Sequence, residues 1–110
     1  MVAAEASECA ADQDKFWEYH DLLFSRQNGE NQGAFSSDKL KGFAKELALD
    51  TQAFDQCLDS GQFKAVVEQQ NAVARQLGVQ STPSFLVNGT PLVGAQPFSA
   101  FQQLISQFIK

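Results

Sequence analysis

The sequence has few of the residues that most often carry chemistry. Its 110 residues include two cysteines, Cys9 and Cys57, and a single histidine. The cysteines lie far apart, so the chain contains no Cys-x-x-Cys pair, and with one histidine they do not supply the ligands of a zinc site. We therefore predict no metal, no cofactor and no catalytic residue within these 110 residues.

Basic residues and long apolar runs are also scarce. The 13 acidic and 8 basic residues give a net charge of −5, which argues against a nucleic-acid partner. No apolar run approaches the roughly 18 residues of a membrane span, so no membrane span is predicted. Hydrophobic residues make up 44% of the chain, and ten of them are phenylalanine, which excludes a disordered chain. The length suits one domain.

We expect no signal peptide in the first residues, because no positively charged segment precedes an apolar stretch. Met1 and Val2 lead at once into an alanine-rich segment that is typical of a helix interior. A chain that opens inside a helix favours a processed or artificial start. The alternative is a short native protein.

Apolar spacing and capping residues predict a run of helices before any strand. The first covers residues 3–11 and the second ends near residue 27, with Asp12 or Asp14 as its N-cap. Ser36 and Asp50 are expected to cap the next two helices, and a longer helix follows over residues 62–77 until Gly78 ends it. The second helix has a stripe predicted to be buried, made of Phe16, Tyr19, Leu22 and Leu23 and widened by Trp17 and Phe24. The long helix is expected to turn inward Phe63, Val66, Val67, Val73, Ala74 and Leu77.

Strands are predicted only near the C-terminal end. Asn88-Gly89 between the apolar residues 85–87 and 92–93 is the strongest short-range hairpin signal, and Pro97 is expected at the first position of a last helix. The fold class is therefore α/β and mostly α. We expect a single domain over residues 1–110, with a helical part at 2–78 and a loop, hairpin and last helix at 79–110.

One proline stands directly before the first predicted strand. Pro83 follows Thr82 there, and proline cannot donate to a strand ladder, so it belongs at a strand's first residue or on an edge. A proline in this place often serves the geometry of its peptide bond. Because cis bonds are only about 5–6% of X–Pro bonds, an ordinary trans proline is the alternative.

The two cysteines allow three interpretations. They are two buried free thiols, a structural disulfide, or a working redox pair. Acidic neighbours, such as Glu8 beside Cys9 and Asp55 near Cys57, raise a thiol pKa and argue against the working pair. Buried free thiols and a structural disulfide both remain possible from the sequence, and we favour the disulfide. It requires an oxidising compartment.

Taken together, several segments resemble the DsbA-like branch of the thioredoxin superfamily. The pattern Gly78-Val79-x-x-Thr82-Pro83-x-Phe85, followed by Val87-Asn88-Gly89, resembles the cis-proline loop and terminal hairpin of that group. Residues 16–24 and 54–61 resemble parts of its inserted helical subdomain. The likeness covers nearly all of the chain.

This resemblance implies a partial thioredoxin fold whose parent is a periplasmic or secreted thiol-disulfide oxidoreductase. It implies that Thr82 and Pro83 line the redox site and contact an extended, thiol-containing polypeptide substrate, with Thr82 offering main-chain hydrogen bonds. It also supports pairing Cys9 with Cys57 in a second, non-catalytic disulfide. The family's first strand and its Cys-x-x-Cys have no counterpart here, so we expect no thiol-disulfide exchange from this chain alone.

A sheet edge follows from the same resemblance. In the family, the strand after the cis-proline pairs with a strand that this chain does not contain. Phe85, Leu86 and Val87 would then form an exposed apolar edge, and we expect a homo-oligomer through it. Two other hypotheses remain: a peptide-binding module without catalysis, and a structural domain whose cysteines hold two helices together.

Overall fold

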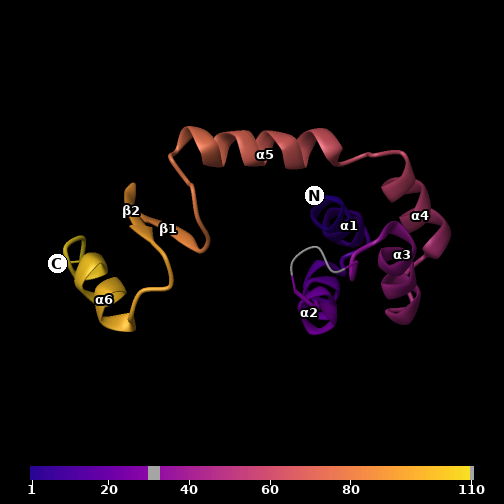
Figure 1. Ribbon diagram of the computed structural model, residues 1–110, viewed down its shortest axis with the longest axis horizontal. Coiled ribbons are helices and arrows are strands. Elements are labelled where there is room, and N and C mark those ends of the chain that lie inside the picture. Colours follow the sequence, from indigo (N-terminus) through magenta and orange to yellow (C-terminus); the bar gives the residue numbers. More distant parts are fainter. Residues whose placement is uncertain (30–32, 110) are drawn as a thin grey trace. The chain divides into compact units, whose positions relative to one another are not determined.

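The computed structural model describes residues 1–29 and 33–109 as a mostly helical chain with one small sheet (Figure 1). This confirms the predicted fold class. In chain order the described elements are α1 (Val2–Ala11), α2 (Phe16–Arg26), α3 (Ser37–Glu46), α4 (Thr51–Asp59), α5 (Lys64–Gln76), β1 (Ser84–Val87), β2 (Thr90–Val93) and α6 (Phe98–Ser106). The chain forms two compact units, unit 1 (Met1–Gln70) and unit 2 (Asn71–Lys110), and α5 runs across their boundary.

Unit 1 is a bundle in which α1 packs against α2, α3 and α4. The largest side chains removed completely from solvent are Tyr19, Phe54 and Leu40. The Tyr19 and Phe54 rings lie 5.5 Å apart, and the Tyr19 hydroxyl donates a 2.8 Å hydrogen bond to the carbonyl of Leu40. Burial raises the pKa of Tyr19, because the ionised phenolate would lose its hydration. This aromatic centre joins α2, α3 and α4.

The caps of α3 and α4 confirm the sequence prediction. The Ser36 side chain accepts from the Lys39 amide, and Asp50 accepts from the Ala53 amide at 3.1 Å. The predicted cap of α2 is wrong, because the N-cap is Lys15 and makes no side-chain cap bond. The reason is the tight turn before α2, in which Asp14 adopts a left-handed conformation with φ of 59°.

The buried stripe of α2 is narrower than its sequence indicates. Tyr19 is fully buried, and Leu22 and Leu23 pack partly against the core. Trp17 and Phe24 were expected to widen the stripe, but they are 65% and 62% exposed. α2 packs against α1 and α3, and Tyr19 also meets Phe54 of α4, so only the side of α2 turned toward these helices is covered.

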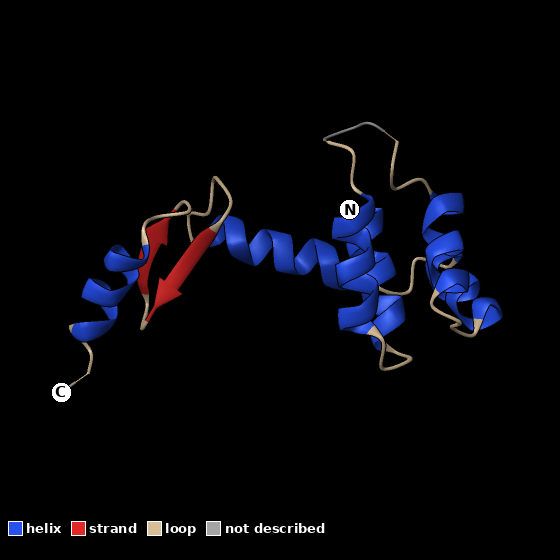
Figure 2. Ribbon diagram, turned by 90° about the horizontal axis from the view of Figure 1, so that it is seen from below, coloured by secondary structure: helices blue, strands red, loops and turns tan. Residues whose placement is uncertain are grey.

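Unit 2 contains the sheet, drawn as two red arrows in Figure 2. β1 and β2 are antiparallel, with Val87 opposite Thr90 at the turn. Asn88 and Gly89 both have positive φ, 47° and 80°, as the predicted two-residue hairpin turn requires. Pro97 is the N-cap of α6, so that helix begins one residue later than predicted.

The apolar residues of α5 and unit 2 are largely exposed. No residue between 71 and 109 is buried. The expected inward orientation of Val66, Val73 and Leu77 is wrong, because these side chains are 40%, 47% and 59% exposed, whereas Val67 is buried. An apolar stripe is buried only where another element packs against it.

Candidate functional site

The loop before β1 holds the residues that the sequence singled out. The Thr82–Pro83 peptide bond is cis, and both residues are exposed. Two hydrogen bonds secure the loop on either side: Gly94 N–H donates to the Pro83 carbonyl at 2.8 Å, and the Ser84 hydroxyl donates to the Ser81 carbonyl at 2.6 Å. The loop is therefore tied to the end of β2 while Thr82 faces solvent.

The main chain of Thr82 has free hydrogen-bonding capacity. Within the described part of the chain, neither its N–H nor its carbonyl takes part in a hydrogen bond. Each main-chain amide offers one donor and one acceptor, and an extended peptide can pair with both. The loop therefore presents a short stretch of backbone that can add a strand.

The hairpin continues this surface and rests on the last helix. The Phe85 ring meets the Phe101 ring of α6 edge-on, with centroids 4.9 Å apart. Among the described elements, β2 is the only partner of β1, so the other edge of β1 is unpaired. Phe85 and Leu86 remain 40% and 52% exposed, and Val87 is half-buried. An apolar strand with an open edge is a template for another chain.

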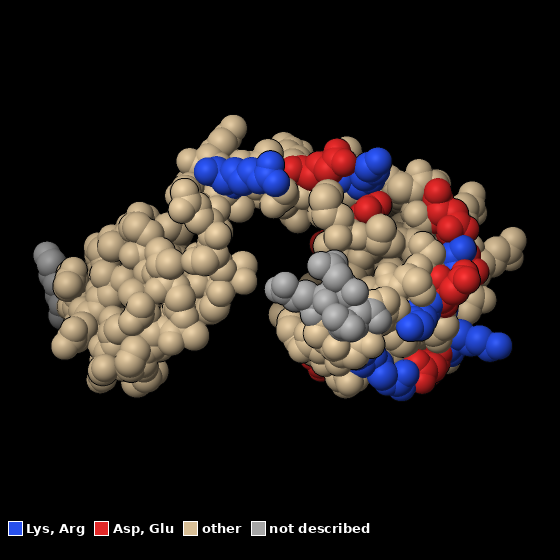
Figure 3. Space-filling model, viewed as in Figure 1, with Lys and Arg blue, Asp and Glu red and all other residues tan. Residues whose placement is uncertain are grey.

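Charge separates the two units, which the sequence analysis did not notice. All 13 acidic residues lie in residues 1–70, and residues 71–110 contain only Arg75 and Lys110 as charged side chains. In the view of Figure 3, the surface formed by the hairpin and α6 carries no acidic or basic residue. The surface around Thr82 is therefore suited to neutral, apolar partners rather than to strongly charged ones.

The two cysteines lie in unit 1 and form a disulfide between α1 and α4. Their Cα atoms are 5.9 Å apart, and Cys9 and Cys57 are 1% and 7% exposed. A polar pocket of about 410 Å³ lies beside them, lined in part by Asp12 and Gln62. The amide of Gln62 donates to the Asp12 carboxylate at 3.3 Å. The cross-link joins two helices of the core.

A second pocket lies between α1 and α2, and the sequence analysis missed it. Its volume is about 260 Å³, and its walls include Phe16, His20 and Phe24 of α2. The sequence signal that pointed to it was the aromatic spacing of α2, which we interpreted as core. No grouping of three potential metal ligands occurs in residues 1–29 and 33–109.

Comparison with known proteins identifies the family. The family profile described as "Thioredoxin" matches residues 1–107, and the chain therefore belongs to the thioredoxin family. The chain is 26% identical over 112 residues to "Disulfide bond formation protein D" of Bacillus subtilis, a match that covers 99% of this chain and 50% of the relative. The resemblance to the DsbA-like branch is confirmed.

Other relatives carry a different name. The chain is 40% identical over 94 residues to "Na(+)/H(+) antiporter NhaA" of Herminiimonas arsenicoxydans, covering 86% of this chain and 14% of the relative. It is 34% identical over 106 residues to "Na(+)/H(+) antiporter NhaA 1" of Salinispora arenicola, covering 96% and 16%. The chain thus spans about half the length of the relatives named disulfide bond formation protein D and a small part of the relatives named as antiporters. No described helix has both the length and the apolar character needed to cross a bilayer.

Proposed function

We propose that this chain is the substrate-contacting part of a DsbA-like thiol-disulfide oxidoreductase that acts on extended, thiol-containing polypeptides. The observation that carries the proposal is the exposed Thr82, whose main-chain groups are unpaired within the described residues, beside Pro83 and at the start of β1. The relatives named disulfide bond formation protein D support the chemistry.

Catalysis needs a thiolate that this chain does not supply at that site. Its cysteines are joined to each other in unit 1, and it contains no Cys-x-x-Cys. We therefore expect the chain alone to show no reduction of insulin. We expect a protein that joins this chain to a segment carrying Cys-x-x-Cys to be active. Turnover by the chain alone that disappears in Cys57→Ala would contradict this assignment.

Binding at the loop can be tested separately from catalysis. An extended, uncharged peptide titrated into the chain should shift the amide signals of Thr82 and Phe85 in NMR spectra. Thr82→Pro removes the main-chain donor and should abolish binding, whereas Thr82→Ala keeps it and should bind normally. Unchanged signals from Asn88 and Gly89 would show that the hairpin is intact in both variants. Equal binding by the two variants would refute the role of the Thr82 main chain.

A second candidate is a non-catalytic module that self-associates or binds peptides through the edge of β1. It is favoured by the exposed Phe85 and Leu86 and by the absence of acidic residues from unit 2. Sedimentation at high concentration should then show a homo-oligomer, and Leu86→Lys should shift it to monomer because charged side chains block edge pairing. Ser99→Lys, on exposed α6, is the matched control. A monomer at all concentrations would exclude this candidate.

The proposal also covers the compartment in which the parent protein acts and the size of that protein. We place the parent protein in the periplasm or outside the cell, where a disulfide such as Cys9–Cys57 persists. The antiporter-named relatives favour a module joined to a membrane transporter as the alternative setting. An antibody against this chain, applied to fractions of the source cells, separates the settings by the size and compartment of the detected protein. Detection only in the cytosol would contradict both.

A further inference from the structure

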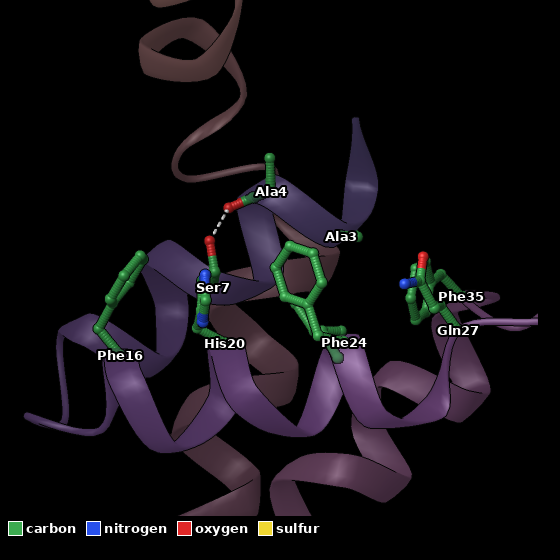
Figure 4. A pocket seen from close by; sticks show the side chains of 9 residues that line it. Ala3, Ala4, Ser7, Phe16, His20, Phe24, Gln27 and Phe35 are labelled. Carbon is green, nitrogen blue, oxygen red and sulfur yellow. Dashed lines mark hydrogen bonds between the residues drawn. The ribbon is translucent and has the colours of Figure 1, made fainter. Parts of the chain in front are cut away.

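The pocket between α1 and α2 has the size and lining of a site for one aromatic ring. On the α1 side, Ala3 and Ala4 contribute side chains that end at Cβ, which leaves space. On the α2 side, Phe16, His20 and Phe24 stand as rings around that space (Figure 4). Its volume of about 260 Å³ lies below the usual range for drug-sized ligands, so a single ring suits it better than a larger molecule.

His20 gives this apolar pocket a hydrogen-bond acceptor. Its Nδ1 lies 3.1 Å from the Asp21 carboxylate. A carboxylate only accepts, so in the tautomer that makes this hydrogen bond Nδ1 carries the proton and Nε2 is the acceptor. No Asp, Glu, Lys or Arg lines the pocket, so nothing there favours an ionised ligand. A ring that carries its own O–H or N–H donor matches this arrangement.

Exposed rings extend the apolar surface beyond the pocket. Trp17 and Phe24 are 65% and 62% exposed, and their ring centroids lie 5.2 Å and 4.7 Å from that of His20. Trp17, His20 and Phe24 thus form a continuous aromatic row on α2. A free small molecule would fill the pocket and leave this row uncovered, whereas a chain attached to the bound ring would lie along it. Exposed apolar patches of this kind mark interaction sites.

We propose that this pocket binds a tyrosine or tryptophan side chain of a polypeptide partner, with the ring between α1 and α2 and its donor on His20 Nε2. The neighbouring residues of the partner lie along Trp17 and Phe24. The site belongs to unit 1 and does not involve Thr82. Its test is therefore independent of the function proposed above.

The single tryptophan of the sequence provides the measurement, because Trp17 touches His20 edge-on. A short uncharged peptide with a central tyrosine is titrated while Trp17 fluorescence is recorded, and the same peptide with phenylalanine serves as the comparison. Tyrosine should bind about fivefold more tightly, the value of one neutral hydrogen bond. N-acetyl-tyrosinamide, which lacks the attached chain, should bind more weakly than the tyrosine peptide.

Two variants and one control test the position of the ring. Ala4→Leu fills the pocket and should abolish binding of both peptides, whereas Ala65→Leu, on exposed α5, should leave binding unchanged. His20→Phe keeps a ring of similar shape but removes the acceptor, so both peptides should bind equally. Circular dichroism checks that each variant is folded. If Ala4→Leu does not fold, His20→Phe still tests the proposal.

Three results would overturn the proposal. One is equal affinity of the two peptides for the unaltered chain. Another is tyrosine binding that survives in folded Ala4→Leu. The third is sedimentation showing that the chain self-associates and that Ala4→Leu abolishes this, because the occupant would then be a second copy of the chain.

Discussion

Unit 1 and unit 2 contain comparable shares of apolar residues, but unit 1 buries many of them and unit 2 leaves most of them exposed. Unit 1 places α1 against three other helices and removes Tyr19, Leu40 and Phe54 completely from solvent. In unit 2, no residue between 71 and 109 is buried, although its hairpin and α6 have regular hydrogen bonding. The comparison shows that secondary structure needs only local interactions, whereas a core needs at least two layers that cover each other.

The disulfide should produce the largest difference between the units. Removing it with Cys9→Ala and Cys57→Ala together should lower the free energy of unfolding of unit 1 by about 4 kcal/mol, because the unfolded chain gains loop entropy. NMR signals of the hairpin should not change. Denaturation followed by Trp17 fluorescence measures the first effect. Hairpin signals that disappear together with those of α1 would show that the units unfold as one.

A buried and an exposed phenylalanine provide the next test. Phe54→Ala should cost about 3 kcal/mol, near the lower end of the usual range because a small bundle can relax around the hole. Phe98→Ala should change stability by less than about 0.5 kcal/mol, since Phe98 is 78% exposed. Both are measured by urea denaturation. A large cost for Phe98→Ala would mean that another surface covers α6 in solution. The contrast between the two units would then disappear.

Alkaline pH should weaken unit 1 specifically. Burial raises the folded-state pKa of Tyr19, so the folded chain keeps a proton that the unfolded chain releases. Stability is then constant below the ordinary tyrosine pKa of about 10 and falls by about 1 kcal/mol over the next pH unit. Tyr19→Phe cannot ionise and should flatten this fall. Parallel pH profiles for the two proteins would contradict the assignment.

A helix cap should have a smaller effect than the disulfide or the buried Phe54. Asp50→Ala removes the acceptor for the Ala53 amide and should cost about 1 kcal/mol. Asp50→Asn keeps an acceptor and should cost much less. Thermal unfolding of the two variants measures the difference. Equal losses would mean that the charge of Asp50 matters more than its hydrogen bond.

Local features of the fold were predictable because neighbouring residues determine them. Ser36 and Asp50 cap their helices, and Asn88-Gly89 turns the hairpin, since each choice depends on a side-chain acceptor or on the positive φ that the turn demands. The cap of α2 was not predictable in this way. Asp14 has the right side chain, but the turn that joins α1 to α2 places it in a left-handed conformation.

The candidate site was predictable only in part. The motif around Thr82 and Pro83 located the loop, but only the tertiary structure shows that the loop is exposed and that the main-chain groups of Thr82 are unpaired within the described residues. The aromatic pocket was missed because spacing on α2 makes Trp17 and Phe24 look like core residues. Periodicity identifies an apolar face but not whether another element covers it.

By itself, the sequence determined the order of helices and strands, most of their ends, the hairpin turn, the family and the concentration of acidic residues in the first 70 positions. Only the tertiary structure decided which apolar stripes are buried, that Cys9 and Cys57 lie within bonding distance, and where the pockets form. The physical reason is the distance along the chain over which each interaction acts. Dihedral preferences and caps act over a few residues, whereas burial depends on which distant segments pack together.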